Sequence, residues 1–331
     1  MKYYFADPKQ KPANPIELPS PPSLLDPDPS AYEAGEDLAA AVNVAIFLGL
    51  PLLVTGEPGT GKTDLADSVS WQLRLGDAPK YEALKFETKS TSAARDLFYT
   101  FDALGRFHDK ESPATSYLTF NALGKAILLA NEPAAVKRYW NETDDALVHA
   151  QPRRSVVLID EIDKAPRDFP NDLLNEIAAM FFRIPELRND KIQAPKRFRP
   201  IVIITSNSEK HLPDAFLRRC VYFDISFPEK RLESIVAGRI TEMKSDAARP
   251  WLREAIEFFL AVRDKEANLQ KKPATAELLS WIVALRGSGA RLDVKLRDQP
   301  EHIDRTLGVL IKNTADLTKV KAIVEAWLGK E

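Results

Sequence analysis

The stretch "GEPGTGKT", residues 56–63, decides the fold of this chain. It matches the pattern G-x-x-x-x-G-K-[ST] at Gly56, Gly61, Lys62 and Thr63. In such a loop the glycines allow consecutive backbone N–H groups to face phosphate oxygens. Lys62 would reach the β- and γ-phosphates of a nucleotide, and the Thr63 hydroxyl would bind Mg²⁺. The pattern predicts a phosphate-binding loop, and the alternative is a glycine-rich turn that binds nothing.

The residues on either side of the loop provide the context that phosphate binding requires. The preceding run "LPLLVTG" has the length and apolar character of a buried strand. The following "KTDLADSVSWQLRL" places Leu65, Val69 and Leu73 at helical spacing. A helix that begins near Lys62 would point the positive end of its dipole at the phosphates. The predicted nucleotide-binding residues are Gly56, Glu57, Pro58, Gly59, Thr60, Gly61, Lys62, Thr63 and Asp64.

A pair of carboxylates follows a second apolar run, in "SVVLIDEIDKA", residues 155–165. The unbroken apolar residues predict a strand covered on both faces, and it ends at Asp160 and Glu161. Carboxylates at the end of a buried strand are costly without a partner, and a magnesium-bound nucleotide would supply one. Asp160 is then predicted to bind the metal and Glu161 to act as general base toward the attacking water. The alternative is a solvated acidic turn.

A third stretch, "IVIITSNSEKHLPDAFLRRC" (residues 201–220), combines a predicted strand with polar and basic side chains. Ser206 and Asn207 follow the strand, where ligands of a parallel sheet collect, so Asn207 is predicted to orient the water or touch the γ-phosphate. Arg218 and Arg219 come next and are candidates for an arginine that reaches the γ-phosphate of a neighbouring subunit. The alternatives are a strand-capping asparagine and two exposed arginines with local partners.

Composition bounds the remaining possibilities. The chain has 331 residues, 44% of them hydrophobic, which is enough for one or two domains with a sizeable core. The net charge of −2 gives no global sign of a nucleic-acid or membrane-surface protein. A single cysteine excludes an internal disulfide and a metal site built from several thiols, and the four histidines lack the spacing of a zinc site. No run has membrane-spanning length and the N-terminus has no apolar signal core, so we expect a cytoplasmic protein.

The pattern along the chain predicts an α/β fold, a P-loop αβα sandwich with a parallel sheet, followed by a small all-helical lid domain. The predicted limits are a proline-rich arm over residues 1–30, a nucleotide-binding domain over 31–228 and the lid over 229–331. The arm holds eight of the 24 prolines. It is expected to lie over its own domain or to strap onto a neighbouring subunit, anchored by Ile16, Leu18, Leu24 and Leu25. A helix is expected to begin after the strand and polar turn of "ALKFETKSTSAARDLFYTF", and another lies within "SYLTFNALGKAILLAN". The stretch "PNDLLNEIAAMFF" is expected to be helical throughout.

Taken together, "GEPGTGKT", "LIDEIDKA", "TSN" and "LPDAFLRRC" make the chain resemble an AAA+ ATPase over roughly residues 31–225. Within that class it resembles the MoxR family, because "SYLTFNALGKAI" is similar to the insertion that those proteins carry before the acidic strand. By this resemblance Arg219 takes the finger position and Arg218 is extra. The family's second sensor arginine is replaced by Ala276, and Lys271, Lys272 or Arg286 are the possible substitutes.

The resemblance implies a ring, usually a hexamer, with ATP and Mg²⁺ bound between subunits. It also implies a chaperone-like remodeler of a protein partner, often one with a von Willebrand factor A domain. Residues 113–130 are the candidate partner-contacting insertion, with Tyr117 and Phe120 expected at its tip. The alternative is that both aromatic side chains belong to the core.

Two other classes of function stay open from the sequence. One is a nucleic-acid motor, against which the near-neutral charge argues, because a phosphate-binding surface leaves a basic footprint. The small basic cluster "KRFRP" at residues 196–200 is expected to be a solvated approach to a strand. The other class is a nucleotide-switched scaffold with weak hydrolysis, which Ala276 favours and the Asp160–Glu161 pair opposes. The choice between ATP and GTP is open as well.

Overall fold

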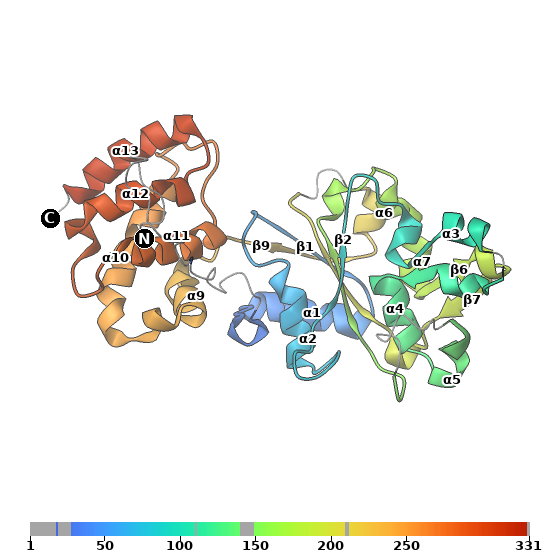
Figure 1. Cartoon of the computed structure of the whole chain (residues 1–331). Coiled ribbons are helices and arrows are strands. Elements are labelled where there is room, and N and C mark those ends of the chain that lie inside the picture. The colour runs from blue at the N-terminus through green and yellow to red at the C-terminus, as the bar shows by residue number, and fades with distance from the viewer. Residues whose placement is uncertain (1–17, 19–27, 110, 140–148, 209–211, 330–331) are drawn as a thin grey trace. The chain divides into compact units, whose positions relative to one another are not determined.

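A computed structural model of the chain describes residues 18, 28–109, 111–139, 149–208 and 212–329 (Figure 1). The chain divides into two compact units. The first comprises residues 32–226, and the second comprises residues 227–331 together with the short segment Pro29–Ala31. Apart from Leu18 and residues 28–30, the predicted N-terminal arm lies outside the described residues. The predicted domain limits at residues 30 and 228 stay a prediction.

A parallel sheet forms the centre of the first unit. In the described part of this unit, five strands lie in the order β2-β5-β8-β1-β9, each parallel to its neighbour. In register, Leu52 of β1 lies opposite Ile203 of β8 on one side and Val221 of β9 on the other. The strands are β1 (Leu52–Gly56), β2 (Leu84–Glu87), β5 (Val156–Asp160), β8 (Ile201–Thr205) and β9 (Val221–Ile225).

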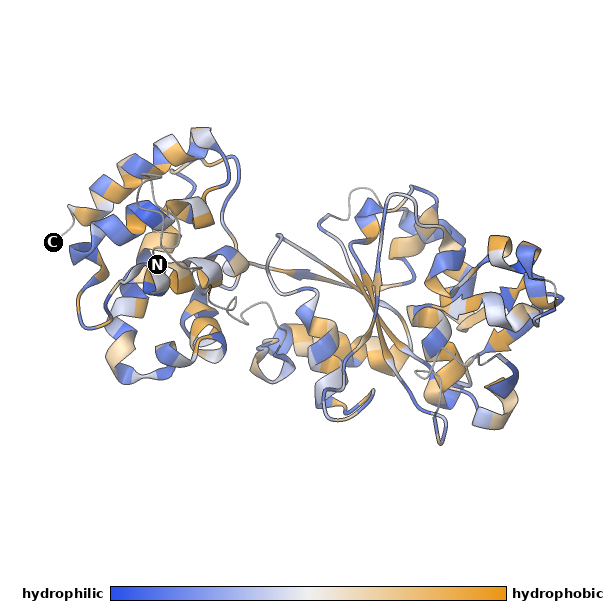
Figure 2. Cartoon of the chain, in the orientation of Figure 1, coloured by the Kyte–Doolittle hydropathy of each residue, from blue (hydrophilic) through white to orange (hydrophobic). Residues whose placement is uncertain are grey.

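The sheet is buried on both faces, because successive side chains of a strand point to opposite sides. In β5, Val157 and Ile159 join one hydrophobic cluster, while Val156 and Leu158 join another on the opposite face. Figure 2 shows the hydrophobic residues gathered on these central strands. The predicted P-loop αβα sandwich with a parallel sheet is therefore confirmed.

Helices cover the two faces of the sheet (Figure 1). One cluster joins the sheet to α1 (Glu36–Leu48) and α2 (Asp64–Gln72), the helix that follows the glycine-rich loop. The other cluster joins it to α4 (Ala122–Leu129), α6 (Phe169–Asp172), α7 (Leu174–Ala179) and α8 (Asp214–Leu217). The short α5 (Pro133–Val136) contributes Val136 to this second cluster.

Two small antiparallel sheets interrupt the regular alternation. The first pairs β3 (Tyr99–Phe101) with β4 (Leu118–Phe120), and α3 (Ala103–His108) lies between them in sequence. The second pairs β6 (Phe181–Ile184) with β7 (Asp190–Gln193). The first is an excursion between β2 and β5, and the second lies between β5 and β8.

These small sheets correct two expectations from the sequence. After β2 the chain forms a 3-10 turn, Ala94–Leu97, and then β3 instead of a helix. The helix expected throughout residues 170–182 ends at Ala179, because Met180 takes a left-handed conformation with φ of 47° and Phe181 enters β6. The helix expected within "SYLTFNALGKAILLAN" is confirmed as α4, which begins at Ala122 after β4.

Phe120 does not lie at an exposed tip, which corrects the expectation for the insertion over residues 113–130. Its side chain is only 2% exposed, and its ring lies 6.5 Å from that of Tyr99 and 6.2 Å from that of Phe182. The pair of Phe120 with Phe182 connects the first small sheet to the second. Tyr117, in contrast, is half-buried and donates a hydrogen bond to Asp109 Oδ2 at 2.6 Å.

Replacing Phe120 by alanine is expected to destabilise the first unit by about 3–5 kcal/mol, the usual result when a buried aromatic ring is deleted. The exposed Thr119 of the same strand offers a matched control, and Thr119→Ala should change stability by less than about 1 kcal/mol. Urea denaturation followed by fluorescence measures both. Equal midpoints for the two variants would contradict the buried position of Phe120.

The second unit is helical in its described residues, as the sequence predicts. Trp251, Trp281, Trp327 and Phe258 form its centre, and each of these side chains is at most 2% exposed. Its helices are hydrophobic on one side and hydrophilic on the other (Figure 2). They are α9 (Leu232–Arg239), α10 (Arg249–Arg263), α11 (Thr275–Ser288), α12 (Pro300–Leu310) and α13 (Thr314–Leu328).

Candidate active site

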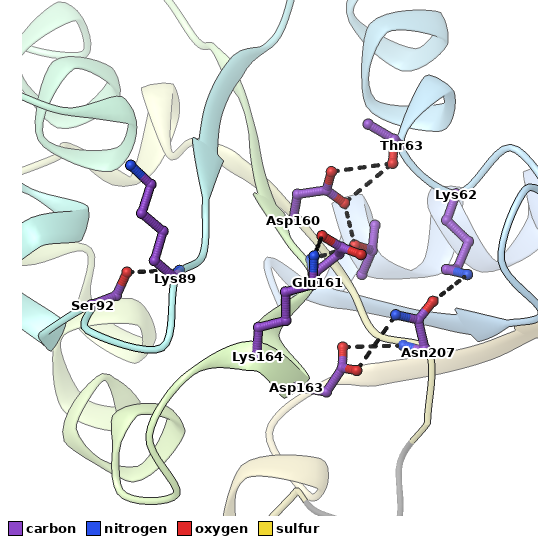
Figure 3. A network of polar contacts seen from close by, with 10 residues as sticks. Lys62, Thr63, Lys89, Ser92, Asp160, Glu161, Asp163, Lys164 and Asn207 are labelled. Atoms are coloured by element: carbon purple, nitrogen blue, oxygen red, sulfur yellow. Dashed lines mark hydrogen bonds and ion pairs between the residues drawn. The ribbon is translucent and has the colours of Figure 1, made fainter.

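The carboxyl edge of the sheet brings the predicted site together. β1 ends at Gly56, β5 at Asp160 and β8 at Thr205, and these three strands are neighbours in the sheet. Because parallel strands end at the same edge, the glycine-rich loop, the acidic pair and the segment with Asn207 meet there. Figure 3 shows these side chains converging from separate elements.

The glycine-rich loop has a backbone that its glycines make possible. Gly56, Gly59 and Gly61 have φ values of 141°, 75° and 85°, a region that other residues rarely adopt. A Cβ atom on Gly56 would also lie 2.6 Å from the carbonyl oxygen of Ile225. The Thr60 hydroxyl donates to the Glu57 carbonyl oxygen at 2.9 Å, which stabilises the bend. The loop is thus held in a curled conformation ahead of α2.

Lys62 reaches back across this loop. Its ammonium group donates to the carbonyl oxygens of Gly56 at 2.8 Å and Glu57 at 3.0 Å, and to Asn207 Oδ1 at 3.3 Å. Burial lowers the pKa of this ammonium, an effect that the nearby carboxylates, chiefly that of Asp160, oppose. The arrangement places a largely desolvated cation at the centre of the loop, where an anion would be strongly attracted.

Two oxygen-bearing side chains beside Lys62 suit a hard cation. The Thr63 hydroxyl lies 3.2 Å from both carboxylate oxygens of Asp160 and donates to them. Hydroxyl and carboxylate oxygens at one strand end are the donors that Mg²⁺ prefers, with waters completing its coordination. These residues therefore fit a magnesium site. Among the described residues no group of three or more His, Cys, Asp or Glu side chains forms a metal cluster.

Glu161 stands in an unusual backbone position. Its φ of 53° and ψ of 53° lie in the left-handed region, and its backbone N–H donates to the Thr205 hydroxyl at 2.8 Å. The carboxylate accepts a hydrogen bond from the Lys164 ammonium, which raises the pKa of that lysine. Strained backbone of this kind persists where neighbouring groups fix it, and it is common at functional sites. Here the Glu161 carboxylate meets Lys164, whereas the Asp160 carboxylate meets Thr63.

Asn207 is held in a defined orientation by Asp163. The backbone N–H of Asn207 donates to Asp163 Oδ1 at 3.1 Å, and its side-chain amide donates to Oδ2 at 3.5 Å. The amide oxygen therefore faces Lys62 (Figure 3). Ser206, the other polar residue singled out here, is fully buried and donates to the Ser208 carbonyl oxygen at 2.7 Å.

Three residues of this network were not among those predicted from the sequence: Thr205, Asp163 and Lys164. Thr205 donates to Asp160 Oδ1 and also accepts from Glu161 N–H, so it connects β8 with the acidic pair. Its place next to Ser206 in "TSN" was a usable signal. Asp163 and Lys164 lie in "DEIDK", but nothing in that pattern says which way the 3-10 turn Ile162–Lys164 directs them.

Arg218 and Arg219 lie away from this cluster. Both precede β9, which pairs in parallel with β1, so they stand at the amino edge of the sheet. Both are exposed, and the Arg219 guanidinium donates to the Ala215 carbonyl oxygen at 2.8 Å. Neither arginine belongs to the site of its own chain in this arrangement.

The candidates for a second sensor lie in the other unit. Ala276 is an exposed residue of α11. Arg286 of the same helix donates to Glu242 Oε2 at 3.0 Å and to the Ala290 carbonyl oxygen. That Lys271, Lys272 or Arg286 takes the place of the second sensor arginine stays a prediction.

The fold and this cluster define a P-loop nucleoside triphosphatase. A curled glycine loop runs from a central parallel strand into a helix, and an acidic pair ends a strand of the same sheet. Residues 52–228 match the model of the ATPase family associated with various cellular activities, AAA. The chain belongs to this family, and membership implies nucleotide binding and ATPase activity in general.

Solved structures with a related fold include domain III of the replication initiation protein DnaA from Thermotoga maritima. It is 13% identical with a TM-score of 0.40, and the match covers 95% of this chain and 100% of that one. A mutant of RuvB from Thermotoga maritima is 17% identical with a TM-score of 0.38, over 80% and 74% of the two chains. No curated protein sequence matches the chain.

Across the described residues, none of the helices is both long enough and apolar enough to span a membrane.

Proposed function

We propose that this protein is a Mg-ATP-dependent ATPase of the MoxR type, which forms a ring and remodels a protein partner. One observation carries the proposal: Lys62, Thr63, Asp160, Glu161 and Asn207 meet at the carboxyl edge of the sheet, while Arg219 stands at the amino edge. In this proposal the first five residues bind and activate a nucleotide, and the sixth serves another copy.

The residues at the carboxyl edge divide the work of hydrolysis. The backbone N–H groups of residues 56–64 and the Lys62 ammonium would hold the phosphates. Mg²⁺, bound by Thr63 and Asp160, would supply neutralisation of phosphate charge. Glu161 accepts a proton from the attacking water. The oxygen of that water bonds to the γ-phosphorus as the bond from phosphorus to the bridging oxygen breaks, which releases ADP. The Lys164 ammonium donates a hydrogen bond to the Glu161 carboxylate and so holds it in place.

Asn207 would orient the attacking water. Its amide is neutral, so it adds no charge near the γ-phosphate, and Asp163 fixes which side of the amide faces the site. A fixed amide oxygen beside Lys62 can accept a hydrogen bond from water next to the transferred phosphoryl group.

The place of Arg219 supports catalysis between subunits. An exposed guanidinium at the amino edge cannot serve as a finger at the carboxyl edge of its own sheet without a large rearrangement. In a ring it would stabilise the charge that develops on the γ-phosphate of a neighbour. A hexamer is the assembly that the MoxR resemblance implies, and the Arg218 side chain is the alternative finger.

The remodeling role and the protein partner come from the MoxR resemblance. The excursion of β3, α3 and β4 lies between β2 and β5, where the resemblance expects an insertion that contacts a partner. With Phe120 in the core, the outward apolar side chains of this excursion are Leu104 and Phe107. A partner with a von Willebrand factor A domain is the class to test first, and nucleic acid is the less favoured ligand.

A nucleotide-switched scaffold with weak hydrolysis is the second candidate, and the exposed Ala276 favours it. A measured turnover number separates the two candidates. Competition between ATP and GTP for the same site establishes the base preference.

The variant Glu161→Gln is expected to bind ATP with unchanged affinity and to hydrolyse it about 10²–10⁴-fold more slowly, because the amide cannot accept the proton. Steady-state phosphate release and equilibrium binding of labelled ATP measure the two effects. Glu132→Gln changes an exposed carboxylate outside the site and should leave both unchanged. Turnover at the wild-type rate in Glu161→Gln would remove Glu161 as the base.

A further inference from the structure

A hollow of about 550 Å³ lies at the amino edge of the sheet in the first unit, opposite to the nucleotide site. Its floor is apolar and includes the buried Phe216, Ile177 and Ile201. Arg154, Lys196 and Arg219 are also among its lining residues. We call this hollow the basic groove.

Charge and exposure give the basic groove a definite chemistry. Among the described residues that line it there is no carboxylate, although the chain as a whole has a net charge of −2. A fourth cation, Arg199, is engaged by the protein, since it donates to the carbonyl oxygens of Gly49 at 2.9 Å and Ile177 at 3.0 Å. Phe47, 88% exposed at the end of α1, extends the apolar surface. The groove therefore suits a segment that is both apolar and acidic.

The part of the N-terminal arm that follows Pro12 has this composition. Most of the arm lies outside the described residues, so its composition is taken from the sequence. Between Pro12 and Gly61 there is no lysine, arginine or histidine, while Glu17, Asp26 and Asp28 are acidic. Its prolines favour an extended chain, which presents side chains to a groove with little loss of conformational freedom. Its aliphatic side chains are Ile16, Leu18, Leu24 and Leu25.

The point where the arm joins the first unit indicates whose groove it meets. Tyr32, the first residue of that unit, lies against the glycine-rich loop, since a Cβ atom on Gly61 would be 3.1 Å from its ring. The basic groove contains Arg219, which the proposed function places at the ATP site of the next subunit. The arm of one copy then starts beside the groove of that neighbour. This step rests on the proposed function, whereas the match of charge does not.

Length is sufficient for this contact. The residues from Ile16 to Asp28, which precede the 3-10 turn Pro29–Ala31, would span up to roughly 40 Å if extended, at about 3.3 Å per residue. That reach exceeds the roughly 17 Å length of a five-residue strand, which separates the two edges of the sheet. The arm is therefore longer than the distance between the two edges of a sheet, as the proposed contact requires.

We propose that the basic groove binds the acidic, proline-rich arm of a second copy of this chain and so joins adjacent subunits. The arm contributes aliphatic side chains to the apolar floor and carboxylates to the cations of the rim. Salt is expected to weaken the contact, because the charges at the rim are open to solvent.

Exchange of charges in the full-length protein tests the proposal. The arm variant carries Glu17→Lys and Asp26→Lys, and the groove variant carries Arg154→Glu and Lys196→Glu. In each variant like charges face each other, so the concentration for half-assembly should rise at least about tenfold. Arg197→Glu is the matched control, since Arg197 is exposed beside Lys196 but does not line the groove. Thermal unfolding confirms that each variant is folded.

Mixing the two variants in equal amounts separates contacts between copies from contacts within one chain. In the mixture the basic arm of one variant meets the acidic groove of the other, and the reverse pairing is also complementary. Assembly by sedimentation velocity should return to within about threefold of the wild type. A chain that carries all four changes should also assemble, which shows that the charges and not the individual residues matter.

Three results would overturn the proposal. If the variants assemble as the wild type does, the groove does not hold the arm, and concentration-dependent ATP turnover would still support the ring. If only the fourfold variant recovers and the mixture does not, the arm binds within its own chain. If the wild-type protein stays monomeric with ATP, both the ring and the contact between arm and groove are wrong. Nucleotide binding, measured on the same samples, shows that such a monomer is folded.

Discussion

Replacing Lys62 by alanine is expected to weaken ATP binding at least about 100-fold. The Lys62 ammonium is the buried cation of the glycine-rich loop and contacts two loop carbonyls and Asn207. With bound nucleotide it would exchange these neutral partners for phosphate oxygens, and each charge-assisted hydrogen bond contributes about 1.5–3 kcal/mol. Two such bonds correspond to a loss of roughly 100-fold or more in affinity. Equilibrium titration with a fluorescent ATP analogue measures the effect.

The same edge of the sheet offers a matched control for this experiment. Lys89 follows β2 and is exposed, and its backbone N–H rather than its ammonium donates to Ser92 Oγ (Figure 3). Lys89→Ala should therefore bind ATP with wild-type affinity while making the same change of charge. Undiminished affinity in Lys62→Ala would refute the assignment of residues 56–64 as the phosphate-binding loop.

The central sheet and the cluster at its carboxyl edge could be predicted from the sequence for a physical reason. Strands such as Val156–Asp160 are buried on both faces, so they appear as unbroken apolar runs that end where the polar residues begin. Because all five strands are parallel, each of these ends falls at one edge. The places of Lys62, Asp160 and Asn207 follow from that rule alone.

The small antiparallel sheets could not be predicted in this way. β4 is only Leu118–Phe120, and a single residue, Asn121, separates it from the apolar α4, so the strand is too short to show a period of its own. The helix over residues 170–182 was predicted too long because Met180 is an ordinary residue in a left-handed conformation, a feature that sequence rarely signals. The position of Phe120 was predicted wrongly because its burial depends on Phe182 of the other small sheet, which is distant in sequence.

Side-chain direction was the other limit. The pattern "LIDEIDKA" contains four charged residues within five consecutive positions. The left-handed backbone at Glu161 determines which partner each of these side chains contacts. It turns Glu161 toward Lys164 and leaves Asp163 to hold Asn207. A contact between residues far apart in sequence, such as that of Asp163 with Asn207, depends on the folded sheet and cannot be read from local spacing.

Removing the Arg219 side chain is expected to produce the largest loss of turnover that leaves nucleotide binding intact. An arginine finger contributes about 10³–10⁵ in rate because it stabilises the charge of the transition state, which the bound substrate lacks. Arg219→Ala should therefore bind ATP as the wild type does and hydrolyse it at least about 10³-fold more slowly. Because Arg219 is exposed and donates to the nearby Ala215 carbonyl oxygen, the change should not unfold the protein.

The dependence on protein concentration makes this test specific for catalysis between copies. In the wild type the rate per subunit should rise with concentration as sites are completed by neighbours, and in Arg219→Ala it should stay low at every concentration. Arg218→Ala changes the adjacent exposed arginine and should retain the rise; loss of turnover in this variant alone would assign the finger to Arg218. A wild-type rate that is flat with concentration and unaffected by Arg219→Ala would mean that each chain hydrolyses ATP alone. The position of Arg219 at the amino edge would then need another role, and its place in the basic groove makes arm binding the first to examine.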